Sequence, residues 1–178
     1  VYGAVAGKIE GVELSVGVSR TVEGLNKIKI AGDYVRNSAP LLQLLPIQVI
    51  NPGAFSLLNG GPSGRRQFTD WGVFHVEQAF LKNWRNFSRC LKQRNSLLRK
   101  GVNSMEELSP WNEEFVNYAE KIACQRQHYI EKLIPYFHKA LSDMTDLEGV
   151  TVSFSKGWDY KTDLLALLSQ SFSRDRVR

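Results

Sequence analysis

The spacing of the apolar residues changes near residue 60, and this change limits the folds open to the chain. Before residue 36, short apolar stretches alternate with polar residues and are broken by Gly3, Gly7, Gly11, Gly17, Gly24 and Gly32. From Ser63 onward, apolar residues recur at steps of three and four. Alternation is typical of strands, and the longer step is typical of amphipathic helices. The sequence therefore predicts an α+β fold in which an antiparallel β-meander precedes helices.

Three strands are expected in the first part, over residues 1–9, 12–20 and 26–35, because these stretches alternate and are rich in β-branched residues. Turns are expected at Glu10-Gly11 and from Glu23 to Asn26. The apolar stretch from Leu41 to Leu45 fits a short helix, which Pro46 would end. The run from Ile47 to Ile50, which lies between two prolines, favours a buried strand.

Two long antiparallel helices are predicted in the second part. The apolar seam of the first helix comprises Phe80, Trp84, Phe87, Leu91 and Leu98, with Arg94 at its one missing step. Gly101 breaks the pattern, and Ser109-Pro110 is typical of a cap followed by proline in the first turn. The second seam comprises Phe115, Tyr118, Ile122, Tyr129, Leu133 and Phe137.

Pro135 lies inside the second helical pattern, where it lacks an amide proton and crowds the preceding turn, so a kink or a break is expected near Ile134. A returning strand is expected over residues 150–155, followed by a helix over residues 160–172. These elements would end the predicted order of meander, helical hairpin, returning strand and helix.

The stretch before the first long helix combines several local signals. Asn59-Gly60-Gly61 permits positive φ, Pro62 cannot continue a strand ladder, and Ser63 can cap a helix. Arg66 and Asp70 then stand four residues apart, which is the spacing of an ion pair on one helix face.

Positive charge is concentrated in one part of the chain. Residues 59–100 hold nine of the 23 Lys and Arg residues and only two of the 18 acidic ones. On the first long helix, five cations share one stripe roughly opposite the apolar seam: Lys82, Arg85, Arg89, Lys92 and Arg99. Such a stripe can follow a phosphate backbone. It can equally be a solvated helix face, or a partner for Glu113, Glu114 and Glu120.

No residues form a recognisable catalytic, cofactor-binding or metal site. The segment GAVAGKI, Gly3 to Ile9, imitates a phosphate-binding loop, but three residues separate its glycines where four are needed and Ile9 replaces the hydroxyl residue. His75, His128, His138, Cys90 and Cys124 do not have the spacing of metal ligands. Two isolated cysteines and no apolar run of about 20 residues predict a cytoplasmic protein without a membrane span.

The string LLNGGPSGRRQFTDWGVFHVEQAF, from Leu57 to Phe80, and the KQRN from Lys92 to Asn95 resemble the RecF family. That resemblance implies an ATPase head similar to those of SMC-like ABC proteins, which binds ATP and Mg²⁺, dimerises around ATP and binds DNA. It also implies action with RecO and RecR, and indirectly RecA, at single-strand gaps and duplex junctions in replication, recombinational repair and the SOS response.

On this resemblance, the chain is expected to be an internal segment. Residues 1–59 would be part of the α/β ATPase lobe, residues 60–145 the helical lobe, and residues 146–178 the return toward the ATPase lobe. No Walker A, signature or Walker B motif occurs in the sequence. The segment is therefore not expected to hydrolyse ATP alone, and none of its residues is assigned to ATP.

Two functional hypotheses remain open from the sequence. In the first, the stripe of Lys82, Arg85, Arg89, Lys92 and Arg99 binds DNA, while Arg65 and Arg66 couple the lobes or contact DNA phosphates. In the alternative, the helices form a protein interaction module that docks a partner through exposed aromatics such as Trp111 or Trp158, and the stripe only favours solubility.

Overall fold

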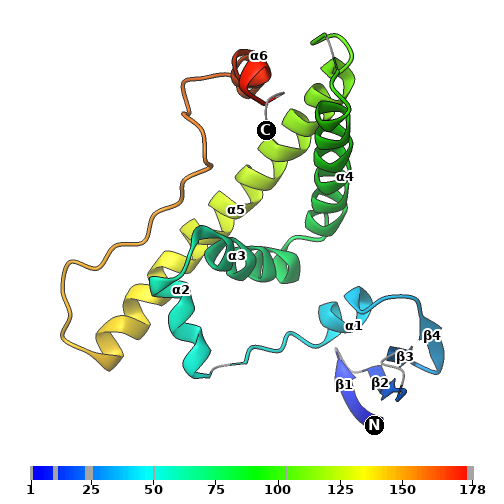
Figure 1. Cartoon of the computed structure of the whole chain (residues 1–178). Helices are drawn as coiled ribbons and strands as arrows, with labels where there is room; N and C mark the ends of the chain where they lie inside the picture. Colours follow the sequence, from blue (N-terminus) through cyan, green and yellow to red (C-terminus); the bar gives the residue numbers. More distant parts are fainter. Residues whose placement is uncertain (1, 10–11, 23–25, 50, 103, 176–178) are drawn as a thin grey trace. The chain divides into compact units, whose positions relative to one another are not determined.

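The computed structural model describes residues 2–9, 12–22, 26–49, 51–102 and 104–175. The chain forms two compact units, Val1–Ala54 and Phe55–Arg178. Strands lie in the first unit and all the long helices lie in the second (Figure 1). This arrangement confirms the predicted α+β class. The lobe boundaries proposed at residues 59/60 and 145/146 stay a prediction.

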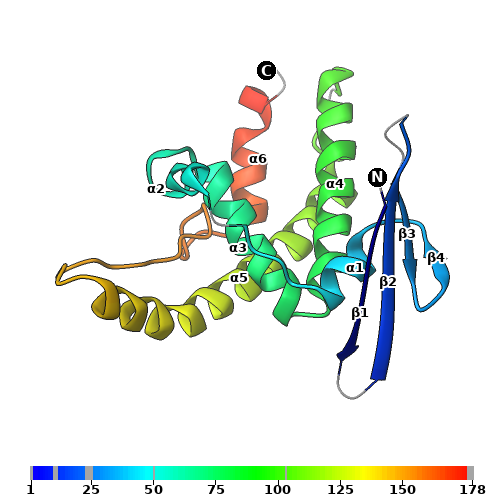
Figure 2. The ribbon, with the colours of Figure 1, turned by 90° about the horizontal axis from the view of Figure 1, so that it is seen from below.

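The first unit contains an antiparallel meander in the order β1-β2-β3-β4 (Figure 2). Its strands are β1 (Tyr2–Ile9), β2 (Val12–Arg20), β3 (Asn26–Ile30) and β4 (Asp33–Val35). The register pairs Val16 with Ile30 and Val18 with Ile28, which places four β-branched residues on one face. Val16 and Ile28 on that face are buried.

The single strand predicted over residues 26–35 is wrong, because a turn divides it. Ala31 and Gly32 have φ of 50° and 91°, and this left-handed pair reverses the chain between β3 and β4. The turn predicted at Glu10-Gly11 lies outside the described residues, as does the turn predicted from Glu23 to Asn26 except for Asn26, which begins β3.

The connection after the sheet is only partly as predicted. The helix α1 (Ala39–Leu44) confirms the expected short helix. Ile47, Gln48 and Val49 are exposed and form no strand, and Ile50 lies outside the described residues. The predicted buried strand is therefore wrong, because no neighbouring strand among the described residues pairs with this run. The 3₁₀ helix η1 (Pro52–Phe55) and α2 (Ser56–Asn59) follow.

The helix α3 (Pro62–Val76) begins two residues earlier than a cap at Ser63 would give. Gly61 is its N-cap, Pro62 occupies the first turn, and Ser63 does not cap it. Gly60 and Gly61 have φ of −83° and −69°, so the predicted positive φ is wrong. Glycine is needed at residue 60 for another reason: a Cβ there would overlap the carbonyl oxygen of Ser56.

The predicted helical hairpin is confirmed as α4 (Phe80–Arg99) and α5 (Ser109–Met144). Gly101, with φ of 77°, ends α4. The amide of Val102 donates to the carbonyl of Leu97, and the amide of Gly101 donates to that of Leu98, which is a Schellman motif. The chain stays helical through Pro135, so the helix is not broken there, and the alternative expectation of a kink near Ile134 stays a prediction.

Contacts between α4 and α5 follow an antiparallel register. Near the start of α4, the side-chain nitrogen of Asn83 donates to the side-chain oxygen of Gln125 at 3.3 Å. The rings of Phe87 and Phe115 lie 4.9 Å apart in the middle. Because α5 is the longer helix, it continues beyond α4 and also contacts α3 (Figure 1).

The packing of α3 on α5 joins an ion pair to an apolar core. Arg126 donates two hydrogen bonds to Asp70, at 2.6 and 2.8 Å. Val73, Phe80 and Ile122, from three helices, form the adjacent buried cluster. The predicted pair of Arg66 with Asp70 is wrong: within the described ranges Asp70 pairs with Arg126 and not with Arg66.

A buried arginine connects α4, α5 and the last helix, α6 (Leu164–Asp175). Arg94 is 6% exposed; its Nε donates to Asn112 at 2.9 Å and its terminal nitrogen to Asp175 at 2.8 Å. Beside it, Leu98, Val102 and Leu108 form a second buried cluster. These contacts hold the last helix against α4 and the start of α5.

The returning strand predicted over residues 150–155 is wrong. This stretch is not part of a strand, and its exposed and half-buried residues still alternate. A strand needs a neighbour for its backbone groups, and the described residues offer none here. The final helix is present, but it begins at Leu164, where Asp163 accepts from the amides of Leu165 and Ala166.

We predict that Gly72→Ala destabilises the helical unit by about 1–3 kcal/mol, because a Cβ on Gly72 would overlap the Tyr129 ring where α3 crosses α5. Gly64→Ala, in the same helix with open space around the added Cβ, is the control and should be neutral or slightly stabilising. Urea unfolding followed by helical circular dichroism measures both. Equal effects of the two substitutions would contradict the packing described.

We also predict that Asp175→Asn lowers stability at neutral pH but not in strong acid. Burial alone would raise the pKa of Asp175, yet hydrogen bonds from Arg94 and Ser171 and the charges of Arg94 and Arg174 hold it below its ordinary value of 3.8. The ionised form is thus the one that stabilises the fold. Its contribution is present above pH 3.8 and is lost as the pH falls through the lower native-state pKa.

Unfolding free energies at stepped pH values test this dependence. The difference between the native chain and Asp175→Asn should shrink below about pH 4. Asp143→Asn, at an exposed position of α5, is the control and should show little difference at any pH. A difference for Asp175→Asn that stays constant into strong acid would contradict the prediction.

Candidate nucleic-acid interface

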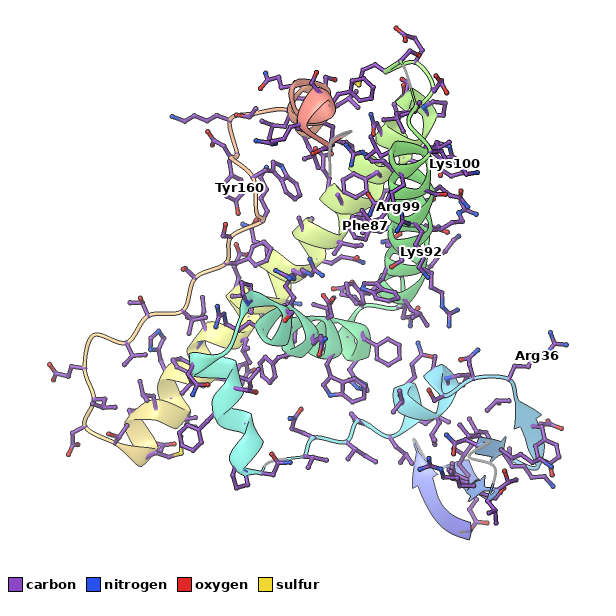
Figure 3. All side chains as sticks on the ribbon, viewed as in Figure 1. Arg36, Phe87, Lys92, Arg99, Lys100 and Tyr160 are labelled. Carbon is purple, nitrogen blue, oxygen red and sulfur yellow. The ribbon has the colours of Figure 1, made fainter. Side chains whose placement is uncertain are left out.

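One face of α4 is exposed and basic. Each of the five predicted stripe residues is exposed, as is the neighbouring Lys100. Figure 3 shows Lys92, Arg99 and Lys100 along α4, with Phe87 toward α5. We call the set of Lys82, Arg85, Arg89, Lys92, Arg99 and Lys100 the basic face.

The buried side of α4 determines where the basic face points. Phe80, Cys90, Arg94 and Leu98 are its buried residues. At 100° per residue, the mean direction of these side chains is nearly opposite that of the cations. The seam is rotated from the predicted one, because Cys90 and Arg94 are buried whereas Trp84 is 43% exposed.

Most cations of the basic face are not neutralised within the chain. Across the described ranges, no ion pair involves Lys82, Arg85, Lys92, Arg99 or Lys100. Arg99 donates only to the backbone carbonyl of Asn95, at 3.2 Å. These charges are therefore available to an external anion.

Arg89 is the exception, since it lies 3.6 Å from Glu114 of α5. Both side chains are largely exposed, so solvent screens the pair. Glu114 also accepts a hydrogen bond from the Cys90 thiol at 3.2 Å. Burial is the main cause that raises the pKa of that thiol, and the hydrogen bond and negative charge of Glu114 raise it further. The thiol therefore stays protonated. The interpretation that the stripe pairs with acidic residues of α5 therefore applies to one stripe residue, Arg89.

The basic face contains a shallow open hollow of about 340 Å³. It is lined by Trp84, Arg85, Ser88, Arg89, Lys92 and Gln93. Trp84 was not expected at the surface, because its spacing fits the apolar seam. A signal was available in the neighbouring polar residues. Trp84 is followed by Arg85 and stands four residues before Ser88, which places it at the edge of the seam.

Arg65 and Arg66 differ in their surroundings. Arg65 donates to the carbonyl of Gly60 at 2.9 Å and of Leu57 at 3.3 Å, so it ties α3 to the end of α2. Arg66 is exposed, and no ion pair of it occurs in the part of the chain that the structure describes. Arg65 therefore has a local structural role, whereas Arg66 is accessible.

The segment that imitates a phosphate-binding loop is a strand. Gly3 to Ile9 lies within β1 and pairs with β2 along its length, so it does not form the strand-to-helix turn that cradles phosphates. Gln48, near the expected lobe joint, is exposed and donates to the adjacent Val49 carbonyl at 3.4 Å.

Titratable groups outside the basic face were candidates for a metal site or an acid–base pair. Among the described residues, no three of His, Cys, Asp and Glu lie close enough to hold a metal ion. His75 packs against the rings of Trp71 and Phe74, and burial lowers its pKa. Asp70, five residues before His75, pairs with Arg126 and not with His75. None of the described helices is apolar over a length that could cross a membrane.

Comparisons with known proteins agree with this architecture. A search against family models finds no match. RecF of Pseudomonas fluorescens (strain SBW25), a DNA replication and repair protein, is 43% identical over 167 residues, which are 94% of this chain and 46% of that protein. RecF of Pseudomonas syringae pv. tomato (strain ATCC BAA-871 / DC3000) is 42% identical over the same shares.

Two solved structures share the fold. A RecF-ATPrS structure of the RecFOR pathway has a TM-score of 0.80 and 20% identity, and it covers 99% of this chain and 51% of that one. A RecF-ATP structure has a TM-score of 0.76 and 21% identity, with coverage of 93% and 47%.

Both curated relatives are named as DNA replication and repair proteins, and the sequence and fold comparisons alike lead to RecF. They confirm the resemblance to RecF inferred from the sequence. The chain spans about half the length of the curated relatives it matches.

Proposed function

We propose that the chain supplies a DNA-binding surface of a RecF-type, ATP-dependent DNA-binding protein. The proposed parent protein acts in DNA replication, recombinational repair and the SOS response, binds single-strand gaps and duplex junctions, and helps to load RecA. The 43% identity to RecF of Pseudomonas fluorescens, a DNA replication and repair protein, supports the repair role. The local contribution of this chain rests on the basic face.

The main observation is that the basic face is exposed and largely unpaired. Five of its six cations have no acidic partner among the residues described, and α4 contains no acidic residue. A phosphate contact by each of these cations would release counterions, so that affinity would fall steeply with salt. A merely solvated face needs no such concentration of one sign of charge on one helix.

Arg66 extends the proposal beyond α4. It is exposed on α3, and no carboxylate of the described chain neutralises it. We assign it to phosphate contact or to coupling with the ATPase lobe. For Arg65, the hydrogen bonds to Leu57 and Gly60 make fixing the start of α3 its first role, and any coupling would pass through that joint.

ATP and Mg²⁺ belong, in this proposal, to parts of the parent protein outside these residues. The two structural neighbours are RecF proteins with ATP or ATPrS. Neither β1 nor the Gln48 segment of this chain has the geometry to hold a nucleotide. ATP-dependent homodimerisation, partnership with RecR and RecO, and a cytoplasmic location are likewise proposed for the parent protein.

The alternative interaction module is less well supported. Trp111 and Trp158, its proposed docking residues, are half-buried. Trp158 also lies under Lys156, whose nitrogen is 4.9 Å from its ring. These aromatics are therefore engaged within the chain.

We predict that changing Lys82, Arg85 and Lys92 to Ala weakens DNA binding and reduces its salt dependence. Each lost phosphate contact should lower the slope of log affinity against log salt by about 0.9 on duplex DNA. Fluorescence anisotropy of labelled gapped and duplex DNA at rising salt measures the slope. In the same titration, Arg66→Ala should lower this slope by no more than about 0.9, which corresponds to one phosphate contact.

The matched control changes Lys132, Lys139 and Lys161 to Ala, which removes the same charge from exposed positions outside the basic face. Its slope should stay close to that of the native chain. Equal slopes for the two triple variants would show that only net charge matters and would contradict the proposal. Binding that is insensitive to salt would favour the protein interaction module.

A further inference from the structure

We propose that Trp84 stacks on an unpaired base of single-stranded DNA whose phosphates lie on the basic face of α4. This inference rests on the proposed DNA-binding function and goes beyond it. It assigns the recognition of single-stranded DNA to one side chain and leaves duplex binding to the cations.

The surroundings of Trp84 are unusual for a residue in an apolar seam. Its side chain is 43% exposed, whereas Phe80, one turn earlier, is 3% exposed. Phe87, one turn later, packs against Phe115. Across the described ranges, Trp84 has no aromatic or cation–π partner of its own. Part of its ring is therefore open to an external planar group.

The hollow beside Trp84 has the chemistry of a nucleotide site. Arg85 and Lys92 supply unpaired positive charge for a phosphate, and the Ser88 hydroxyl supplies a donor and an acceptor. An aromatic ring next to a basic track is the combination by which proteins bind single strands without reading their sequence. An apolar protein segment would fit less well, because three cations line the same hollow.

The geometry also indicates why the base must be unpaired. In a duplex, each base is already stacked between its neighbours, so its face is closed to an indole ring. A gap or junction presents bases whose faces are free. Duplex DNA would then contact only the cations, whereas gapped DNA would contact the cations and Trp84.

The experiment measures binding of three probes to the native chain and to Trp84→Ala. The probes are a duplex, the same duplex with a gap of about ten nucleotides, and that gapped DNA with abasic residues in the gap. Trp84→Ala should weaken binding to the gapped probe about tenfold and leave duplex binding nearly unchanged. The abasic probe keeps the phosphates, so the native chain should bind it as weakly as Trp84→Ala binds the gapped probe.

Three further variants separate stacking from folding and from general apolar contact. Trp84→Phe should recover most of the binding, whereas Trp84→Leu, which is apolar but has no ring face, should not. Tyr136→Ala removes an exposed aromatic from α5 and should have no effect.

The inference is overturned if Trp84→Ala weakens binding to the duplex and to the gapped probe equally. It is also overturned if abasic residues in the gap weaken binding by Trp84→Ala as much as they weaken binding by the native chain. Salt-dependent duplex binding that requires Lys82, Arg85 and Lys92, without any effect of Trp84, would overturn this inference and keep the proposed function. Absence of binding to every probe would overturn both.

Discussion

The helical unit depends on one buried cation. Arg94 lies in the apolar seam of α4, where an unpaired charge would be very costly, and it is satisfied by Asn112 of α5 and Asp175 of α6. Those two contacts fix how α4 is rotated about its own axis. Since the cations of the basic face lie nearly opposite Arg94, the same interaction that joins the three helices also turns these cations toward solvent.

The other half of the unit is organised around α5 in a similar way. The ion pair of Arg126 with Asp70 and the close approach of Gly72 to Tyr129 hold α3 across α5. Polar contacts that need a specific geometry thus determine how the helices align along one another. The small apolar clusters beside these contacts remove apolar side chains from water. Together these contacts fix α3 on α5 and α4 against α5 and α6, and so determine which face of α4 is exposed.

Periodicity was enough to predict the meander, the hairpin and the position of Arg94, because local spacing carries that information. It did not predict the partners of Arg94, since Asp175 lies 81 residues away in sequence. It also favoured a pair of Arg66 with Asp70, which the more distant Arg126 replaces. The strands expected near residues 47–50 and 150–155 failed because a strand depends on a neighbour that local sequence cannot reveal. Trp84 was misplaced because burial of Cys90 and Arg94 rotates the seam.

The most direct test of the account is a lysine footprint of the chain with and without gapped DNA. Acetylation of exposed lysines, quantified by mass spectrometry, would compare Lys82, Lys92 and Lys100 of the basic face with Lys132 and Lys139 of α5. DNA should protect the three lysines of the basic face from acetylation and leave the two lysines of α5 reactive. Protection of the α5 lysines alone, or the same protection at all five, would contradict the assignment of DNA binding to the face that Arg94 orients.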